Sequence, residues 1–167
     1  RLRDLGVTNL RLGAQTCILS YKADLTGGDP PRPDPRAVEG LFSGVSSLKF
    51  DVLHVDNANP AVVATYPQEA EAVLRSLVRH CTSGNVLALG LESADPTVAK
   101  ANNLNSTSEQ ALDAIRAINR IGGIVGASGL PELLPGLNFI VGLEGETGNS
   151  LRMNEELLRT VLAEGLL

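Results

Sequence analysis

The 167-residue sequence contains no Trp, three Phe, two Tyr and two Cys, and its longest apolar runs cover only a few residues. With so few aromatics and a net charge of −5, it lacks the basic, base-stacking surface of a nucleic-acid-binding protein. The apolar runs are far shorter than the roughly 18 residues that cross a bilayer, and no N-terminal segment resembles a signal peptide. We therefore expect a soluble, cytoplasmic protein with no membrane partner and no nucleic-acid signature in this segment.

The two cysteines, Cys17 and Cys81, are far apart and show no Cys-x-x-Cys spacing. They predict neither a disulfide framework nor a complete metal site, and two reduced, buried thiols are the simpler interpretation. His54 and His80 are also distant from each other, and such positions more often serve packing or the surface than metal binding. The sequence thus predicts no metal ligands.

The overall composition is that of a globular chain. A hydrophobic fraction of 43% and a charged fraction of 20% exclude extensive disorder. At this length we expect a single domain over residues 1–167 with a substantial core. Because the sequence begins at Arg1 without Met and ends directly after a helical pattern, we also expect it to be part of a longer polypeptide.

Short apolar runs alternate along the chain with amphipathic stretches, which is the pattern of parallel strands joined by helices. The apolar runs predict strands at 9–13, 52–55, 86–91 and 138–141. The amphipathic stretches predict helices over 38–45, 67–81, 95–100, 107–121 and 151–162, with a turn at 59–60 and a long Gly- and Pro-containing loop over 122–136. The helix that begins near residue 107 has two capping-box alternatives, Thr107 with Gln110 or Ser106 with Glu109. The predicted fold class is α/β, with a mainly parallel sheet and helices on its outer face.

Polar or glycine residues follow every predicted strand, at 13–16, 56–60, 92–95 and 142–147. Ligands of parallel α/β proteins meet the carboxyl ends of the strands, so these residues predict a binding site at one edge. The alternative is ordinary turn chemistry, because turns also use Asn, Asp, Ser and Gly. Glu92 fits that alternative least, since a carboxylate directly after an apolar strand lies among apolar residues and needs a partner.

Three segments at these strand ends resemble, in order, the later half of a radical S-adenosylmethionine (radical SAM) domain. They are 90–98 (GLESADPTV), 102–109 (NNLN, then Thr107 and Glu109) and 138–147 (NFIVGLEGET). The family pattern is G(I/V)(E/Q)S, then N(K/R), then a strand ending in GLPGET. Residues 55–60 (VDNANP) resemble the ExNP motif of the coproporphyrinogen-oxidase-like branch, and 13–16 (GAQT) lies where GGxxP would be. The resemblance covers about residues 5–165, and the whole sequence most resembles uncharacterised archaeal members of this superfamily.

The resemblance implies a partial (β/α) barrel, an incomplete TIM-like barrel with about strands two to five present. In the family, a CxxxCxxC motif after the first strand holds a 4Fe–4S cluster, and that motif is absent from this sequence. The full-length protein is therefore expected to be the enzyme, using S-adenosylmethionine and the cluster as cofactors. We expect neither cofactor to stay bound to this segment alone, which would be inactive.

The resemblance also implies which residues contact S-adenosylmethionine. Carried over onto matching positions, the cofactor contacts are Gly13, Gln15, Thr16, Asp56, Asn57, Glu92, Ser93 and Asn138. Glu92 stands at the Glu/Gln position that meets the sugar or the methionyl part, and the residues at 13–16 would bring backbone groups to the methionyl amino end. The sequence departs from the family where Asn57 replaces an acidic residue, with Asp56 as its neighbour, where Leu104 replaces Lys or Arg, and where Glu144 replaces Pro.

By this resemblance the protein reductively cleaves S-adenosylmethionine at the cluster and so starts radical chemistry on a substrate that the sequence does not specify. One alternative is a non-enzymatic α/β half-barrel that binds a nucleoside-like ligand or a partner protein. Another is an acid–base enzyme that uses Asp56 and Glu92 as a pair. An incomplete barrel also leaves edge strands unpaired, which would allow a homodimer.

Overall fold

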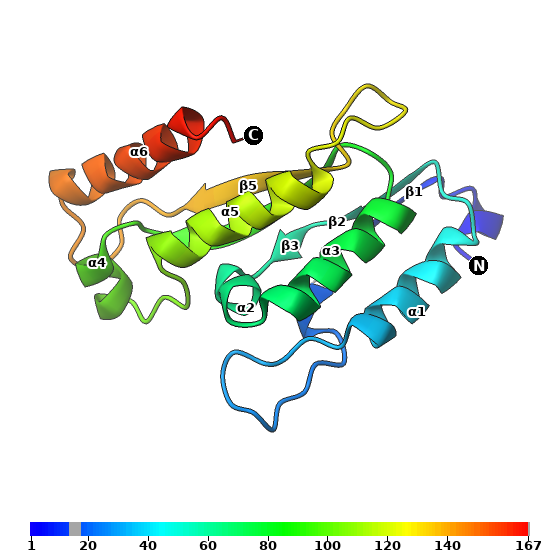
Figure 1. The fold of residues 1–167 in the computed structure, drawn as a ribbon, viewed down its shortest axis with the longest axis horizontal. Coiled ribbons are helices and arrows are strands. Elements are labelled where there is room, and N and C mark those ends of the chain that lie inside the picture. Colours follow the sequence, from blue (N-terminus) through cyan, green and yellow to red (C-terminus); the bar gives the residue numbers. More distant parts are fainter. Residues whose placement is uncertain (14–17, 167) are drawn as a thin grey trace.

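The computed structural model describes residues 1–13 and 18–166. Gln15 and Thr16, two of the predicted cofactor contacts, and Cys17 lie outside the described residues. The strands are β1 (Asn9–Leu12), β2 (Val52–Val55), β3 (Asn57–Ala58), β4 (Asn85–Glu92) and β5 (Leu133–Phe139). The helices are α1 (Pro35–Ser46), α2 (Pro60–Thr65), α3 (Pro67–His80), α4 (Pro96–Ala101), α5 (Ser108–Gly122) and α6 (Gly148–Ala163) (Figure 1). None of the described helices is long and apolar enough to span a membrane.

The described strands pair in parallel and in sequence order. β1 pairs with β2 in one sheet, and β4 lies between β3 and β5 in the other and pairs with both. Asp56 alone separates β2 from β3, and its backbone carbonyl accepts a hydrogen bond from the Ala88 N–H at 2.7 Å. Between β2 and β4 the buried Asn85 side chain takes the place of backbone hydrogen bonds. Its amide oxygen accepts from the Val55 N–H at 2.5 Å, and its amide nitrogen donates to the Val55 carbonyl at 3.1 Å. The predicted α/β class with parallel strands is confirmed, and the described strands form no closed barrel.

Helices α1, α3 and α5 lie side by side on one face of the strands (Figure 1). The predicted helical stripes point to this interface, as shown by Val38 and Phe42 of α1, which are both 0% exposed. The opposite side of the interface comes from alternate residues of β4, namely Leu87, Leu89 and Leu91. Leu87 and Leu89 belong to the main hydrophobic core between the helices and the sheet, whereas Leu91 belongs to a smaller cluster with Ala111 of α5 and Leu157 of α6.

The first residues of α5 and α2 decide between the two predicted capping boxes and correct the predicted turn at 59–60. The Thr107 hydroxyl accepts from the Gln110 N–H and the Gln110 side chain accepts from the Thr107 N–H, so the Thr107–Gln110 alternative is the capping box of α5. The predicted turn at 59–60 is instead the start of a short helix, α2, because the Asn59 side chain caps it by accepting from the Ala61 N–H.

The fourth predicted strand was placed too late in the chain. The sequence predicted a loop over 122–136 and a strand over 138–141, whereas β5 runs from Leu133 to Phe139. Pro135 and Gly136 hid the strand because both residues weaken a strand pattern. Pro135 pairs in register with Leu87 at the edge of the described sheet, where a strand tolerates Pro. Gly136 lies so close to Val86 that an added Cβ would meet its Cγ1 at 3.0 Å.

No α-helix of the described part of the chain covers the other face of the sheet, where the short 3-10 helix Ile18–Ser20 lies beside β3 (Figure 1). Along β4 this face presents Val86, Ala88, Gly90 and Glu92, which alternate with the buried leucines. On α6, Leu157 and Val161 are buried while three other leucines of the predicted helical stripe, Leu151, Leu158 and Leu162, are exposed. The stripe on this last helix is therefore only partly used for packing.

Candidate functional site

A cavity of about 470 Å³ lies at the carboxyl ends of β3, β4 and β5, where the sequence predicted a binding site. We call it the strand-end cavity. Three of the eight predicted contact residues line it, Asn57 from β3, Glu92 from β4 and Asn138 from β5. The segment 103–106, between α4 and α5, forms another of its walls.

Glu92 has an unusual backbone at this cavity. Its φ of 68° is in the left-handed region that non-glycine residues rarely adopt, and the register of β4 against β5 shifts between Gly90 and Glu92. The absence of a side chain at residue 90 leaves room for the Glu92 carboxylate, because a Cβ there would lie 3.0 Å from Glu92 Oε1. Within the described residues the carboxylate has no hydrogen-bond or ion-pair partner. A strained backbone that presents an unpaired carboxylate is typical of a functional position.

Amide side chains surround this carboxylate. Asn138 pairs in register with Gly90, and its exposed side chain makes no hydrogen bond within the described residues. Asn103 and Asn105 reach the same cavity from the α4–α5 segment. Sequence reasoning did not assign these two as contacts, and the signal that could have found them is the amide-rich stretch at 102–105 between two helices.

The cavity lining selects for the charge of a ligand. Glu92 is its only charged residue among those described, and the amides can both donate and accept hydrogen bonds. A carboxylate accepts from hydroxyl and ammonium groups and repels phosphate. The site therefore favours a polar, neutral or cationic small molecule, and its volume lies within the roughly 300–1,000 Å³ of small-molecule pockets.

Asp56 and Gly13 lie together beside β1 and do not line the strand-end cavity. The Asp56 carboxylate pairs with Arg11, with 2.8 Å between Oδ1 and Nε. A Cβ on Gly13 would collide with that carboxylate, so the glycine makes room for the ion pair. Because Asp56 is already paired and outside the cavity, the structure does not bring Asp56 and Glu92 together as an acid–base pair.

Ser93 is buried on the far side of the strand end from Glu92. Its hydroxyl accepts a hydrogen bond from the Asp95 N–H at 3.2 Å. Asp95 in turn accepts from the Ser150 hydroxyl of α6 at 2.8 Å, and this bond keeps the pKa of the Asp95 carboxyl below its usual range. The Asn154 side chain of α6 accepts from the Ala94 N–H at 2.7 Å. Residues 93–95 therefore tie the end of β4 to α6.

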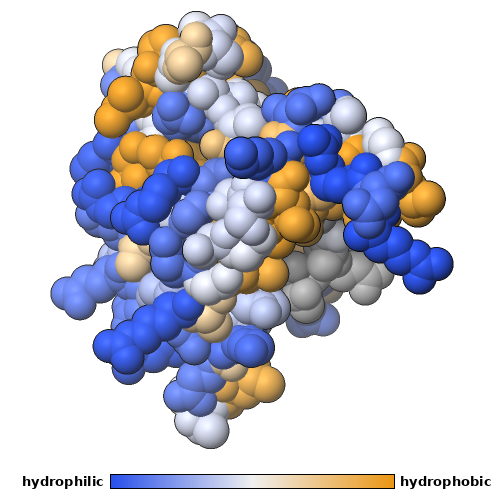
Figure 2. All heavy atoms as spheres, turned by 90° about the vertical axis from the view of Figure 1, so that its right-hand side faces the viewer, coloured by the Kyte–Doolittle hydropathy of each residue, from blue (hydrophilic) through white to orange (hydrophobic). Residues whose placement is uncertain are grey.

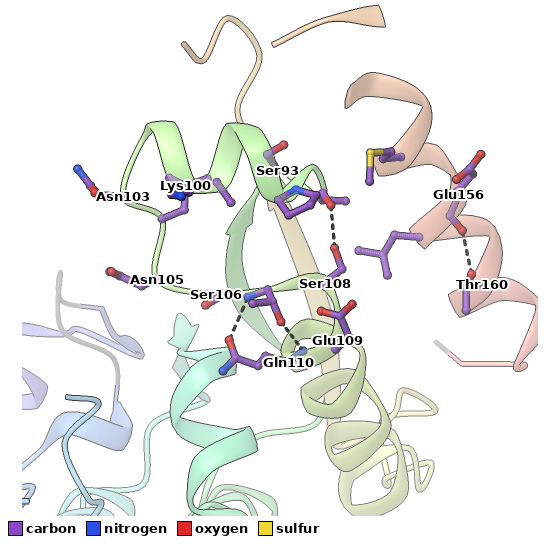
Figure 3. A pocket seen from close by; sticks show the side chains of 17 residues that line it. Ser93, Lys100, Asn103, Asn105, Ser106, Ser108, Glu109, Gln110, Glu156 and Thr160 are labelled. Carbon is purple, nitrogen blue, oxygen red and sulfur yellow. Dashed lines mark hydrogen bonds between the residues drawn. The ribbon is translucent and has the colours of Figure 1, made fainter. Parts of the chain in front are cut away.

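Ser93 lines a second hollow of about 810 Å³, which we call the helix groove (Figure 3). The groove runs between α4, the first turn of α5 and α6, and its apolar lining includes Leu104, Met153 and Leu157. In Figure 3, Glu156 and Thr160 lie on α6 along one side of the groove, and Ser108 and Glu109 lie on α5 along the other. The helix groove and the strand-end cavity share the segment 103–106.

The remaining titratable side chains do not assemble a metal centre in the described part of the chain. Burial raises the pKa of the Cys81 thiol to about 12, so little thiolate exists near neutral pH. His54 lies on β2 with its Nε2 atom buried and unpaired, and His80 joins α3 to Glu39 of α1 through a 2.9 Å hydrogen bond. As the sequence suggested, both histidines occupy positions of packing or surface contact.

Three archaeal proteins described as uncharacterized are similar to this chain. One from Methanocaldococcus jannaschii is 44% identical over 164 residues, one from Archaeoglobus fulgidus is 40% identical over 168, and one from Methanopyrus kandleri is 26% identical over 161. The alignments cover 97%, 99% and 96% of this chain but only 30%, 31% and 27% of those proteins. The chain thus spans about a third of the length of the relatives it matches. No protein-family profile matches it.

Proposed function

We propose that this chain is a core segment of a radical SAM enzyme and that its strand-end cavity binds S-adenosylmethionine. The observation that carries the proposal is the unpaired Glu92 carboxylate, held by a left-handed backbone at the end of β4 and lining one cavity with Asn138. The family resemblance independently implies that these two positions meet this cofactor. The proposal extends to a partial barrel, with the face of the sheet that carries no α-helix as the inner face.

The residues present fit S-adenosylmethionine. The ligand carries hydroxyl groups, an ammonium, a sulfonium and one carboxylate, so its net charge is positive and suits an anionic cavity whose other polar groups are amides. Glu92 would accept hydrogen bonds from hydroxyl or ammonium groups, and Asn138 would orient an adjoining polar edge. The bound cofactor supplies radical chemistry in this family, and the part of this chain would be to bind it and orient it.

The described residues do not fit the iron–sulfur cluster. Such a cluster needs three or four thiolates, whereas Cys81 lies partly buried against the core with its pKa raised. The cluster ligands would have to come from another part of a longer polypeptide. We accordingly assign no cluster-dependent step to residues of this chain.

The second candidate is a non-enzymatic α/β half-barrel that binds a nucleoside-like ligand through the same cavity. The lining of the cavity supports it as well, because the Glu92 carboxylate and the amides can accept hydrogen bonds from the hydroxyl groups of a nucleoside. The two candidates differ in the sequence that precedes this segment in the longer protein. A CxxxCxxC motif within a strand-and-loop distance of residue 1 would support the enzyme, and its absence would leave the binding module.

Partner binding through the sheet edges also remains a proposal. In the described residues β1 pairs only with β2, and β5 only with β4, so one edge of each strand is open. On the β1 and α1 side of the molecule, hydrophobic residues gather in separate clusters within a largely hydrophilic surface (Figure 2). Light scattering at high protein concentration tests a homodimer, and a monomeric mass would exclude it.

Binding of S-adenosylmethionine, measured by calorimetry on the cluster-containing full-length protein, tests the proposed site. Glu92→Ala removes a charge-assisted hydrogen bond and should weaken binding by roughly 1.5–3 kcal/mol, about ten- to a hundredfold. Asn138→Ala removes a neutral hydrogen bond and should cost about 0.5–1.5 kcal/mol.

Glu146→Ala is the matched control. The Glu146 carboxylate accepts from the Gly142 N–H at 3.2 Å in the loop after β5 and lines neither cavity. This substitution should lower the melting temperature slightly and leave binding unchanged. If Glu92→Ala binds as well as the parent while Glu146→Ala does not, the ligand site lies elsewhere and the polar strand ends are turn residues.

A further inference from the structure

The strand-end cavity and the helix groove are separated by a single thin wall, the segment 103–106. Asn103, Leu104, Asn105 and Ser106 line both hollows. Asn103 turns the chain with a left-handed φ of 51°, and the side chains of Asn103 and Asn105 extend away from α6 (Figure 3). The position of this wall therefore sets the shape of both hollows at once.

Asn102, the residue directly before the wall, ties it to the loop between β5 and α6. Its Nδ2 donates to the Val98 carbonyl at 2.8 Å and to the Glu144 carbonyl at 2.9 Å, and its Oδ1 accepts from the Glu144 N–H at 3.2 Å. The carboxamide thus pairs with both backbone polar groups of a residue 42 positions later. Only a primary amide of this length offers donors and an acceptor in that arrangement.

The wall has few other attachments. At its far end the Thr107 capping box fixes it to α5, and Ser106 is buried. At its near end the Leu104 N–H donates to the Ala99 carbonyl at 2.9 Å. The Asn105 side chain makes no hydrogen bond within the described residues. Attachment of the wall to the exit of β5 therefore depends on Asn102, which itself lines neither hollow.

We propose that Asn102 is a positioning residue: it fixes the wall 103–106 against the loop after β5 and thereby sets the affinity of the strand-end cavity for its ligand. The statement about affinity rests on the proposed function. The statement about the wall does not, because it concerns hydrogen bonds within the chain. The two statements can therefore fail separately.

Hydrogen exchange followed by mass spectrometry tests the wall, with Asn102→Ala as the variant and Asn102→Asp as a second one of the same size. Asp keeps an acceptor for the Glu144 N–H but loses both donors and places a charge against two carbonyl groups. Asn102→Ala removes three hydrogen bonds and Asn102→Asp removes two, and both variants should exchange at least about tenfold faster at residues 103–106 and 142–147, because loss of a single hydrogen bond already implies a change of that size. Asn119→Ala is the matched control, since Asn119 on α5 donates to the Ile115 carbonyl at 3.0 Å with the same spacing of four residues.

S-adenosylhomocysteine, a stable analogue, serves as the binding probe on the full-length protein. Asn102→Ala should bind it three- to tenfold more weakly than the parent, with Asn119→Ala unchanged. Unaltered exchange at both segments in the Asn102 variants would overturn the positioning role. Faster exchange with unaltered affinity would overturn its effect on the cavity. Failure of the parent to bind the probe would count against the proposed function, while the exchange data would still decide the role of Asn102 in the wall.

Discussion

The two faces of β4 differ in what they contribute to the protein. Leu87, Leu89 and Leu91 point toward the helices and are each 0% exposed, whereas Val86 on the other face is 41% exposed and is followed on that face by Ala88, Gly90 and Glu92. The helix-covered face carries large apolar side chains that stabilise the fold. The open face carries small residues that let other groups approach the backbone and ends in a strained carboxylate. One strand therefore supplies stability on one side and a candidate binding surface on the other.

The largest expected effect comes from the covered face. Leu89→Ala removes a fully buried side chain and should lower the free energy of unfolding by about 2–5 kcal/mol, measured by urea denaturation. Val86→Ala, on the same strand but on the open face, should cost less than about 1 kcal/mol. Similar losses for the two variants would mean that the open face is also covered in solution, and the comparison between the faces would no longer hold.

The second effect concerns the junction between the two sheets. Asn85→Ala leaves the buried N–H and carbonyl of Val55 without partners, and a buried unsatisfied group costs about 1–3 kcal/mol. We expect a loss of about 2–3 kcal/mol in the same denaturation experiment. Asn85→Asp, which retains only the acceptor, should not restore the parent value. A loss below about 0.5 kcal/mol for Asn85→Ala would show that the sheet does not depend on this side chain.

The third effect is a gain in the free energy of unfolding, and it concerns a residue on the open face. Glu92→Gly places a residue that tolerates a positive φ at the strained position, and it should raise the free energy of unfolding by about 1 kcal/mol. The same variant should lose S-adenosylmethionine binding at least as completely as Glu92→Ala. An increase in stability together with a loss of S-adenosylmethionine binding would show that Glu92 serves binding and not the fold. A stability loss instead would indicate that Glu92 supports the fold and that its strain has another cause.

The sequence predicted much of this architecture because its signals are local. Periodicity placed α1 and α3 and found β4, and capping chemistry located the start of α5. It missed the first five residues of β5, because the register that pairs Pro135 with Leu87 is set by tertiary packing. The site was predicted in part. Glu92 and Asn138 line the same cavity, as expected. Ser93 was predicted to join them but lines the helix groove instead, because the left-handed backbone at Glu92 changes the direction of the chain. No local sequence pattern predicts the left-handed backbone at Glu92.

The smallest effect is the pH dependence of stability that comes from the contact between α1 and α3, two of the helices on the covered face. Glu39 of α1 accepts hydrogen bonds from His80, from Ser76 and from Arg79 of α3, and these bonds, chiefly those from His80 and Ser76, lower the pKa of its carboxyl to about 2. The pKa of Glu39 is thus lower in the folded chain than the 4.5 of an unperturbed carboxyl. Its contribution to stability is therefore complete above about pH 4.5 and is lost as the pH falls toward 2.

Solvent screening keeps this contribution below about 1 kcal/mol, because the side chain is 37% exposed. The difference in urea midpoint between the parent and Glu39→Gln should shrink toward zero as the pH falls from about 4.5 to 2. Ser76→Ala, which removes one of the donors, should shift that decline to higher pH. Equal acid sensitivity of the parent and Glu39→Gln would mean that the α1–α3 contact is held by apolar packing alone. The acid response would then come from the pairs elsewhere on the surface, such as Arg116 with Glu164, and the covered face would owe its stability to its buried side chains without electrostatic help.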